Sequence, residues 1–509
     1  MNNDFKLKLI FSCRFEPNYT YSHSLTHYLY LPYGMGILTA FLRQHNYYVE
    51  QEDFSVRFNR RFKNMDLYYN IDRNEQEMLR FLRSGEAEDK LYLFIDKLLD
   101  STSIEEFDAI GFSIFSSLHF IFALMLSKRI KQRTDTPIVF GGPFITLYGQ
   151  LYPDILSFID YMIVGDGRVP LLKLIEYLKK KITISEVPNL IYRDNGKLIV
   201  NPRQHYSIED IPMPDFSGLP LKLYKNPCLK FPGYRIELPY QITRGCTNRC
   251  SFCVHKYIDD KLEFKSYDKV LSELSQMKER YKNNEFCFMD SAINNSYEYL
   301  EGLCDLFIKN KLDINWSVDV KVGNLDKHIL KKMKKAGCFS LAFGIESGSD
   351  SILKRMHKGF TAERASRTLR DAAELGFKNF LCLIVGYPHE TQEDIEQTTN
   401  FIIKNKKYIR YCNIYRFALT YASPIYYEPE NYCVTNLTPL QPPFCFAFDE
   451  SEGLKWEQKQ KQQEDSQRQI IKVVHKNACF GWRLYIFSYY SIRLFRYIIG
   501  KIKKACSLT

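Results

Sequence analysis

Long apolar runs are absent from this sequence, and so is a secretory signal. No uncharged apolar stretch approaches the roughly 20 residues that a membrane-spanning helix needs. Residues 1–8 contain an acid and no apolar core, unlike a signal peptide. The 14 cysteines are scattered apart from one cluster, with no framework spacing, which argues against a disulfide-stabilised secreted domain. We therefore expect a cytoplasmic protein.

Excess positive charge is scarce outside the C-terminal tail. The net charge is +11, but residues 451–509 hold 12 Lys and Arg against 4 Asp and Glu, a surplus of 8. The composition therefore implies no basic groove for nucleic acid. Aromatic residues are abundant, and the 36 Tyr and 37 Phe indicate a large, partly apolar cavity or interface.

The length of 509 residues predicts two or three domains. In the first 205 residues short apolar runs alternate with amphipathic stretches, which is typical of a doubly wound, Rossmann-like parallel sheet. The expected strands are residues 6–12, 48–54, 108–114, 137–140 and 160–164. A charged helical insertion is expected over residues 56–100.

Small residues follow several of these expected strands. They are Gly34, Gly36, Ser113, Ser116, Gly141, Gly142, Pro143, Gly165, Asp166 and Gly167. The carboxyl ends of parallel strands form the ligand crevice of such a sheet, and glycine there lets backbone approach a ligand closely. Glycine also serves tight strand-to-helix turns, so both interpretations stay open at each position.

Residues 206–237 are rich in proline and are expected to be a linker over the surface. A second series of alternating elements spans residues 238–430. Its expected strands are residues 240–245, 285–290, 314–320, 339–346, 379–387 and 412–420. Six such units suit a partial (βα)6 barrel, whose functional groups lie at the carboxyl ends of the strands.

Cys246, Cys250 and Cys253 form a C-x3-C-x2-C loop after the first strand of this series. Three thiolates so close can converge on one metal centre. A structural zinc site would need a fourth ligand, which His255 could supply. A 4Fe–4S cluster normally takes four thiolates, so three would leave one iron open for chemistry. Burial as ordinary apolar side chains is the third possibility.

The C-terminal region, residues 431–509, is expected to be helical. Residues 455–476 are polar and rich in Gln and Lys, whereas residues 480–505 are aromatic and basic. The latter composition suits a helix in an anionic lipid interface, which predicts peripheral membrane contact. A helix that caps the barrel with a solvated basic face is the equal alternative.

The cysteine loop, with Phe252 before its last cysteine, resembles the cluster motif of the radical S-adenosylmethionine (radical SAM) superfamily. The segments Gly344-Ile345-Glu346-Ser347-Gly348-Ser349 and Ile384-Val385-Gly386-Tyr387-Pro388 are similar to strand ends of that barrel. The glycine loops of residues 1–205 resemble the cobalamin-binding domain that precedes the barrel in one large subgroup. The resemblance covers residues 1 to about 430.

The resemblance implies a role for particular side chains. Cys246, Cys250 and Cys253 would hold three irons of a 4Fe–4S cluster, and S-adenosylmethionine would chelate the fourth. Glu346 would bind the ribose hydroxyls, and Asp290 and Ser291 would contact the methionine end. The weaker candidates are Ser317 and Lys321 for the carboxylate or ribose, and Ile384 and Gly386 beside the adenine.

For cobalamin, the resemblance implies that the nucleotide tail lies along the small-residue loops named above. Many cobalamin domains carry a histidine that ligates cobalt, but residues 30–36 contain none. That departure implies cobalt without a histidine below it, or a domain that has lost cobalamin.

The expected function is methylation of an unactivated carbon by a cobalamin-dependent radical SAM enzyme. One alternative is oxidation, cyclisation or epimerisation, with or without cobalamin. Another is a non-catalytic corrinoid- or zinc-binding protein on a membrane. The methylthiolating branch is disfavoured, since only Cys13 precedes residue 228 and a second cysteine set is missing. The expected partners are a lipid, peptide or other small substrate and a reductant such as flavodoxin or ferredoxin.

Overall fold

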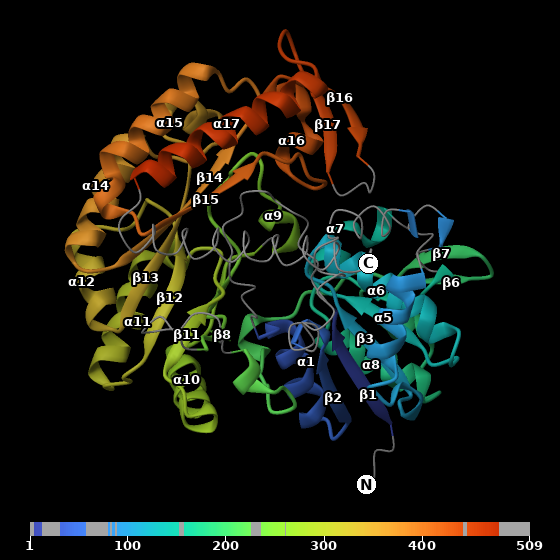
Figure 1. The fold of residues 1–509 in the computed structure, drawn as a ribbon. Helices are drawn as coiled ribbons and strands as arrows, with labels where there is room; N and C mark the ends of the chain where they lie inside the picture. Colours follow the sequence, from blue (N-terminus) through green and yellow to red (C-terminus); the bar gives the residue numbers. More distant parts are fainter. Residues whose placement is uncertain are drawn as a thin grey trace, which may run out of the picture.

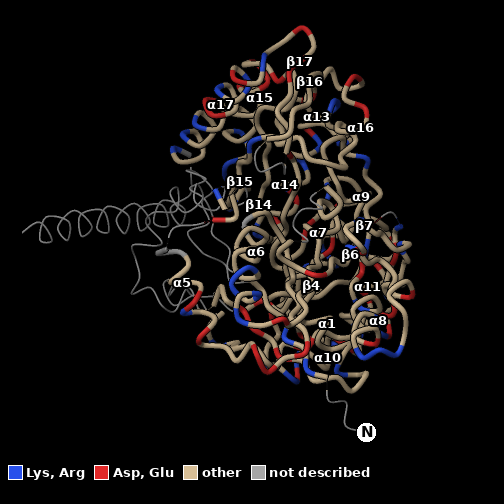
Figure 2. The backbone as a smooth tube through the Cα atoms, turned by 90° about the vertical axis from the view of Figure 1, so that its right-hand side faces the viewer, with Lys and Arg blue, Asp and Glu red and all other residues tan. Residues whose placement is uncertain are grey.

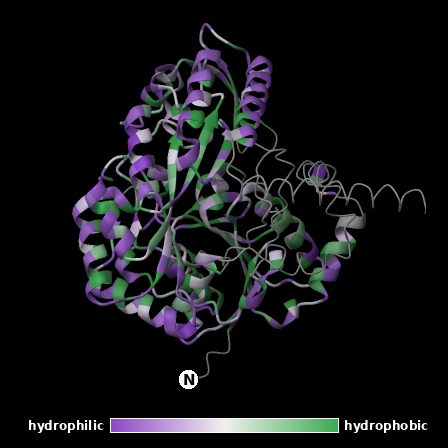
Figure 3. Ribbon diagram, turned by 60° about the vertical axis from the view of Figure 1, so that its left-hand side comes forward, coloured by the Kyte–Doolittle hydropathy of each residue, from purple (hydrophilic) through white to green (hydrophobic). Residues whose placement is uncertain are grey.

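The computed structural model describes residues 5–12, 31–56, 80–81, 84–86, 89–151, 157–224, 236–259, 261–440 and 445–477. They form two helix-covered sheets that lie beside each other, the N-terminal one in blue to cyan and the second in green to orange (Figure 1). Figure 3 shows mostly hydrophobic strands inside a layer of helices with hydrophilic faces. In Figure 2 Lys and Arg are interspersed with Asp and Glu along the described backbone.

The N-terminal sheet has the strand order β2-β1-β3-β4-β5-β6-β7, and its first five strands are parallel. The strands are β1 Lys6–Phe11, β2 Tyr48–Asp53, β3 Ala109–Ser113, β4 Ile138–Gly141, β5 Tyr161–Ile163, β6 Leu190–Asp194 and β7 Lys197–Val200. The order 2-1-3-4-5 is that of a doubly wound sheet. This confirms the predicted class of the domain.

Helices cover both faces of this sheet, because its strands are apolar on both sides. They are α1 Tyr33–Gln44, α5 Asp89–Leu99, α6 Ser117–Lys131, α7 Pro143–Tyr148 and α8 Arg168–Leu178. Leu7 and Leu9 share a core with α1 and α8, whereas Ile10 and Ile110 pack with α5 and α6.

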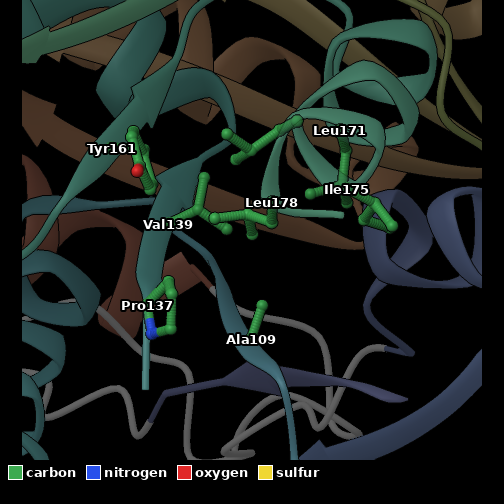
Figure 4. A pocket seen from close by; sticks show the side chains of 8 residues that line it. Ala109, Pro137, Val139, Tyr161, Leu171, Ile175 and Leu178 are labelled. Carbon is green, nitrogen blue, oxygen red and sulfur yellow. The ribbon is translucent and has the colours of Figure 1, made fainter. Parts of the chain in front are cut away.

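A small apolar pocket lies between α8 and the amino ends of β3 to β5 (Figure 4). Its lining is apolar apart from the hydroxyl of Tyr161, so it belongs to this packing, and it lies at the opposite edge from the glycine loops.

The hairpin of β6 and β7 was not predicted. Its two-residue turn, Asn195-Gly196, has both φ angles positive. Asn-Gly between apolar runs is a strong hairpin signal, so the sequence did contain this information.

The second sheet consists of six parallel strands in chain order, which confirms the partial (βα)6 barrel. The strands are β8 Leu238–Tyr240, β11 Glu285–Phe288, β12 Asn315–Val320, β13 Cys338–Glu346, β14 Lys378–Val385 and β15 Tyr411–Arg416. The helices are α9 His255–Ile258, α10 Tyr267–Tyr281, α11 Tyr297–Lys309, α12 Lys327–Lys335, α13 Asp350–Arg355, α14 Ala362–Glu374, α15 Gln392–Asn405 and α16 Pro424–Tyr427.

The first barrel strand differs from the expectation of one strand over residues 240–245. β8 ends at Tyr240, and β9 (Thr243–Arg244) pairs instead with β10 (Glu263–Phe264). The carboxylate of Asp290 accepts hydrogen bonds from the backbone N–H groups of Ile242 and Thr243. These bonds satisfy donors that a continued strand would have used in the sheet, so the chain turns out of it.

The region after the barrel is only partly helical. β16 (Val434–Pro439) and β17 (Phe446–Glu450) form an antiparallel hairpin, so the prediction of an all-helical region was wrong there. α17 (Trp456–Asn477) confirms the polar helix. Residues 480–505, with their predicted membrane contact, lie outside the described residues. Within the described part, every helix is too short or too polar to cross a membrane.

α17 covers the edge strand β15, with which the barrel sheet ends. The side-chain amide of Gln467 donates to the carbonyl of Ile414 (2.8 Å), and that of Gln463 donates to the carbonyl of Phe417 (3.1 Å). Exposed edge strands are templates for unwanted pairing. The glutamines of α17 therefore satisfy carbonyls at the open side of the partial barrel.

Candidate functional site

The three cysteines lie on one loop between β9 and α9, at the carboxyl end of the first barrel strand. Gly245 opens the loop with φ +86°, and a Cβ there would lie 2.2 Å from the carbonyl oxygen of Lys261. Only glycine therefore suits this approach. Burial raises the pKa of the Cys250 thiol and, with the neighbouring thiols, that of Cys253 to about 11.

Two lysines flank the thiols. Lys321, which follows β12, has its Nζ 2.6 Å from Thr247 Oγ1 in the cysteine loop. Burial lowers its pKa, and the charges of Cys246 and Cys250 oppose that effect. Lys358 lies just after the C-terminal end of α13, and its buried Nζ is 3.3 Å from Glu346 Oε1. Burial alone would lower its pKa, but the charges of Glu346 and Cys250 raise it above its usual value.

Glu346 ends β13 in an unusual conformation. Its φ of +71° is rare for a residue with a side chain, and the pairing with β14 is irregular at this point. Burial raises the pKa of its carboxyl group in spite of the neighbouring Lys358. Strain of this kind persists only where the surroundings enforce it, and it is concentrated at functional sites. The structure thus places Glu346 beside Lys358, which the sequence analysis missed.

Asp290 follows β11, and its buried carboxylate holds the turn from β8 into the cysteine loop. Burial raises its pKa to about 7. Its Oδ2 is buried and receives no hydrogen bond from the described residues. That free acceptor position leaves Asp290 able to contact a ligand beside the loop.

Ser291 and His255 face each other, with Oγ and Nδ1 3.1 Å apart. His255, the fourth ligand of the alternative zinc site, therefore contacts Ser291. Among the described residues, no three His, Cys, Asp or Glu side chains are gathered closely enough to hold a single metal ion between them. In an iron–sulfur cluster each thiolate instead binds a different iron. By donor type and charge, three thiols beside two lysines fit an anionic iron–sulfur cluster.

Asn295 is a further residue that the sequence analysis missed. Its buried amide donates to the carbonyl of Gly245 (3.2 Å) and accepts from the Thr247 backbone (3.2 Å). It connects the segment after β11 with the cysteine loop. An asparagine in a loop carries no periodic signal, so only the fold reveals this contact.

The contacts of Ser317, Ile384 and Gly386 limit the roles predicted for them. Ser317 lies in the middle of β12 and faces Glu237 (3.4 Å), not the cysteine loop. Ile384 is half-buried near the end of β14. A Cβ at Gly386 would lie 2.1 Å from Gln463 Cγ, so close packing against α17 already explains glycine there.

The small-residue loops of the first domain do share one edge, because they follow parallel strands of one sheet. A Cβ at Gly36 would lie 2.4 Å from Phe216, and at Gly142 it would lie 2.6 Å from the Ile114 carbonyl. Packing and turn geometry therefore explain these two glycines. At Gly34, Gly141 and Gly167 a Cβ would meet only ordinary contacts of 3.5–3.7 Å.

The other small residues of this edge lie close to these glycines. Gly34 lies beside Ser113, whose Oγ would be 3.7 Å from its Cβ. Ser116 immediately precedes α6, and its Oγ lies 3.4 Å from His119 Nδ1. Pro143 is the first residue of α7, directly after Gly142.

Asp166 joins this edge to the cysteine loop. Its carboxylate binds Arg168 (2.8 Å) and Arg244 (3.3 Å), and Arg244 lies two residues before Cys246. Burial would raise the pKa of Asp166, but the two guanidinium groups hold it below its usual value. Its Oδ1 also accepts from the Arg168 backbone. The carboxylate of Asp166 therefore binds one arginine of each domain.

Further contacts show that the carboxyl edges of the two sheets face each other. α7, which follows Gly142, packs against α9, which follows Cys253 (Figure 1). Arg203 donates to the carbonyl of Ile258 (3.1 Å), and the rings of Tyr148 and Tyr421 are 6.4 Å apart. The predicted cofactor loops of both domains therefore border one region.

Comparisons with known proteins agree with this arrangement. Residues 240–402 match the Radical SAM superfamily. An uncharacterized methyltransferase of Pyrococcus horikoshii is 28% identical over 287 residues, which cover 55% of this chain and 60% of that protein. The anaerobic magnesium-protoporphyrin IX monomethyl ester cyclase of Rubrivivax gelatinosus is 24% identical over 54% of this chain and 50% of that one. The chain thus spans 50–60% of the length of these relatives.

Among solved structures, the cobalamin-dependent S-adenosylmethionine radical enzyme OxsB, with aqua-cobalamin and S-adenosylmethionine bound, superimposes with a TM-score of 0.66. The match covers 96% of this chain and 71% of OxsB at 17% identity, so it concerns the fold. The barrel is therefore a radical SAM domain, as the cysteine loop and strand ends predicted. Over 96% of its length the chain is similar in fold to OxsB, with a sheet domain before the barrel.

Proposed function

We propose that this protein is a cobalamin-dependent radical SAM enzyme that methylates an unactivated carbon of its substrate. The observation that carries the proposal is the facing of two edges: a cysteine loop flanked by lysines, and a glycine-rich edge joined to it through Asp166 and Arg244. When bound, the cluster and S-adenosylmethionine supply a 5′-deoxyadenosyl radical that removes a hydrogen atom, and cobalamin supplies the methyl group.

The side chains of the barrel edge would hold and orient the charged groups. Cys246, Cys250 and Cys253 would ligate three irons. Lys321 and Lys358 would compensate the negative charge of the thiolates, since both interact electrostatically with them. A carboxylate accepts hydrogen bonds in pairs, so Glu346 is suited to the two hydroxyls of a ribose.

The glycine-rich edge would contribute backbone rather than side chains. Packing within the protein does not require glycine at Gly34, Gly141 and Gly167, because a Cβ would meet only ordinary contacts there, and this supports close approach of a large ligand to the backbone. The fold match to a cobalamin-bound enzyme supports cobalamin as that ligand. The methyltransferase relative favours methylation.

Cyclisation or another non-methylating outcome is the second candidate, because one relative is a cyclase. A flavodoxin or ferredoxin is the proposed reductant in either case, and the cytoplasm is the proposed compartment. Methylated product separates the two candidates once a substrate is found.

The test is anaerobic reconstitution with iron, sulfide and hydroxocobalamin, followed by a reductive assay with S-adenosylmethionine. We expect about four irons per chain, bound corrin and release of 5′-deoxyadenosine. Release of 5′-deoxyadenosine without bound corrin would support the non-methylating candidate. Bound zinc without cleavage would contradict the proposal as a whole.

A further inference from the structure

Asp319 lies on the inner face of the barrel sheet, at a position that no motif assigns. Along β12 the side chains of Trp316, Val318 and Val320 are buried in the core shared with the outer helices. Side chains of a strand alternate between its two faces, so Asp319 points to the opposite, inner face. It is exposed there, two residues before Lys321 and below the cysteine loop.

The carboxylate of Asp319 has no partner in the described part of the chain. No hydrogen bond or ion pair reaches it, and burial is the one cause that raises its pKa, to about 6. The two lysines of the barrel edge are engaged elsewhere, since Lys321 contacts Thr247 and Lys358 contacts Glu346. Solvent therefore reaches the carboxylate of Asp319, although neighbouring atoms partly desolvate it.

The residues directly beside Asp319 in the sheet are uncharged. The register places Ala342 of β13 beside it, with Phe380 of β14 beyond. Met289 directly follows β11 and, from the pairing of Phe288 with Val318, lies on the other side of Asp319 with 43% of its surface exposed. These side chains offer methyl, thioether and aromatic surface.

The nearby thiols leave the charge of Asp319 uncompensated. Burial raises the pKa of Cys287 and that of Cys382 to about 12, and the charge of Asp319 contributes to both shifts. The thiols are therefore neutral near pH 7. Glu237 and Asp290 also raise the pKa of Cys287, and Glu346 that of Cys382, so Asp319 is one of several acids near these thiols, with apolar side chains as its direct neighbours in the sheet.

We propose that Asp319 binds a positively charged group of the substrate, an ammonium or guanidinium, while the adjacent apolar part packs on Met289 and Phe380. This inference rests on the proposed function, since it takes the inner face below the cysteine loop as the substrate site. An ionised carboxylate accepts hydrogen bonds and donates none, and burial without a counter-charge is costly. A charged donor therefore gains most from this position.

The experiment uses the reconstituted holoenzyme with S-adenosylmethionine and a matched pair of probes. 4-Fluorobenzylamine carries the cation and an aromatic ring, and 4-fluorobenzyl alcohol has the same shape without the charge. Ligand-observed fluorine NMR measures the affinity of each. The variants are Asp319→Asn, which removes the charge, and Asp319→Glu, which keeps it. The control is Asp313→Asn, an equal change at an exposed acid before β12.

We expect the amine to bind the unmodified enzyme and the Asp313→Asn control alike. Asp319→Asn should weaken amine binding about ten- to hundredfold, as expected for loss of a charge-assisted hydrogen bond. Asp319→Glu should restore part of the affinity, and the alcohol should respond to none of the changes. Because Asp319 forms no hydrogen bond or ion pair with the residues that the structure describes, the variants should fold.

Several outcomes would overturn the inference. They are equal binding of amine and alcohol, failure of both to bind the unmodified enzyme, and amine binding that survives Asp319→Asn. Weaker binding of S-adenosylmethionine itself in Asp319→Asn, measured by equilibrium dialysis, would assign Asp319 to the cofactor instead. Failure of the proposed function is separate, because it would show as absent 5′-deoxyadenosine while Asp319 still selected the amine.

Discussion

The carboxyl edges of the two sheets face each other, but they present different chemical groups. The barrel edge presents thiols, two lysines and two buried carboxylates, whereas the edge of the first sheet presents glycines, at three of which a Cβ would meet only ordinary van der Waals contacts. Side chains with charge suit a small ligand that is itself charged and chelating. Glycines have no side chain, so they suit a large ligand that must approach the backbone closely. The difference predicts that substitutions at each edge should affect one cofactor and spare the other.

The largest effect is expected at the cysteine loop. Cys250→Ala removes one thiolate ligand, so iron should fall from about four per chain to near zero while the first domain still binds corrin. Iron analysis and absorbance measure the cluster, and corrin content is measured in the same sample. Cys433→Ala, at an exposed cysteine of the same half of the chain, is the matched control and should keep its iron. Full cluster absorbance in Cys250→Ala would disprove the ligand assignment.

The converse test is made at the glycine-rich edge. Gly141→Val fills space at the end of β4, where a Cβ itself meets nothing closer than 3.7 Å. Because Gly141 ends β4 at the edge where the proposed ligand would approach the backbone, corrin affinity should fall about tenfold or more, as for loss of roughly 1.4 kcal/mol. Spectroscopic titration with hydroxocobalamin measures this, and iron content should not change. Equal loss of iron and corrin would show that the two edges do not act separately.

The third prediction concerns the joint between the edges. Asp166→Asn leaves Arg168 and Arg244 without their carboxylate, and breaking a buried ion pair commonly costs about 3 kcal/mol in unfolding free energy. Denaturant unfolding measures the loss. Because the pKa of Asp166 is depressed in the folded state, its contribution should be complete above the unfolded value of about 4 and decline as pH falls through the folded value. A stability difference between variant and parent that is constant down to pH 2 would contradict this.

The smallest effect, of opposite sign, is expected at Asp290. Burial raises its folded pKa to about 7, so between pH 4 and 7 the folded state binds more protons than the unfolded chain. Its contribution to stability should therefore fall as pH rises through this window. Asp290→Asn keeps an oxygen acceptor for Ile242 and Thr243 but cannot titrate. Unfolding at pH 5 and pH 8 should show a flatter pH dependence in the variant, and an unchanged slope would refute the assignment.

Much of the fold was predictable, because strand and helix periodicities are local properties of the chain. The five parallel strands of the first sheet and the six of the barrel were placed within a few residues. The break after Tyr240 was not, since it depends on Asp290, which lies about 50 residues further along. The hairpin of β16 and β17 was missed because it packs beside the barrel and its strands have no regular alternation.

The candidate site shows the same division. The cysteines were predicted from their spacing, and Glu346 from the resemblance to the radical SAM superfamily. Lys358 was missed because its contact with Glu346 arises when the chain folds back after α13. Asp166 was expected to line the cofactor, but its carboxylate is bound by two arginines, one of them from the other domain. Contacts of this kind depend on how the two domains dock.

The sequence by itself determined the two sheets, the cysteine loop and the strand ends that carry the motif, because each follows from residue types over a short stretch. Only the tertiary structure decided that the two edges face each other, that Arg244 and Asp166 join them, and that Lys358 and Lys321 stand beside the thiols. The physical reason is that ion pairs and buried hydrogen bonds between distant segments depend on packing in three dimensions, which leaves no periodic signal along the chain.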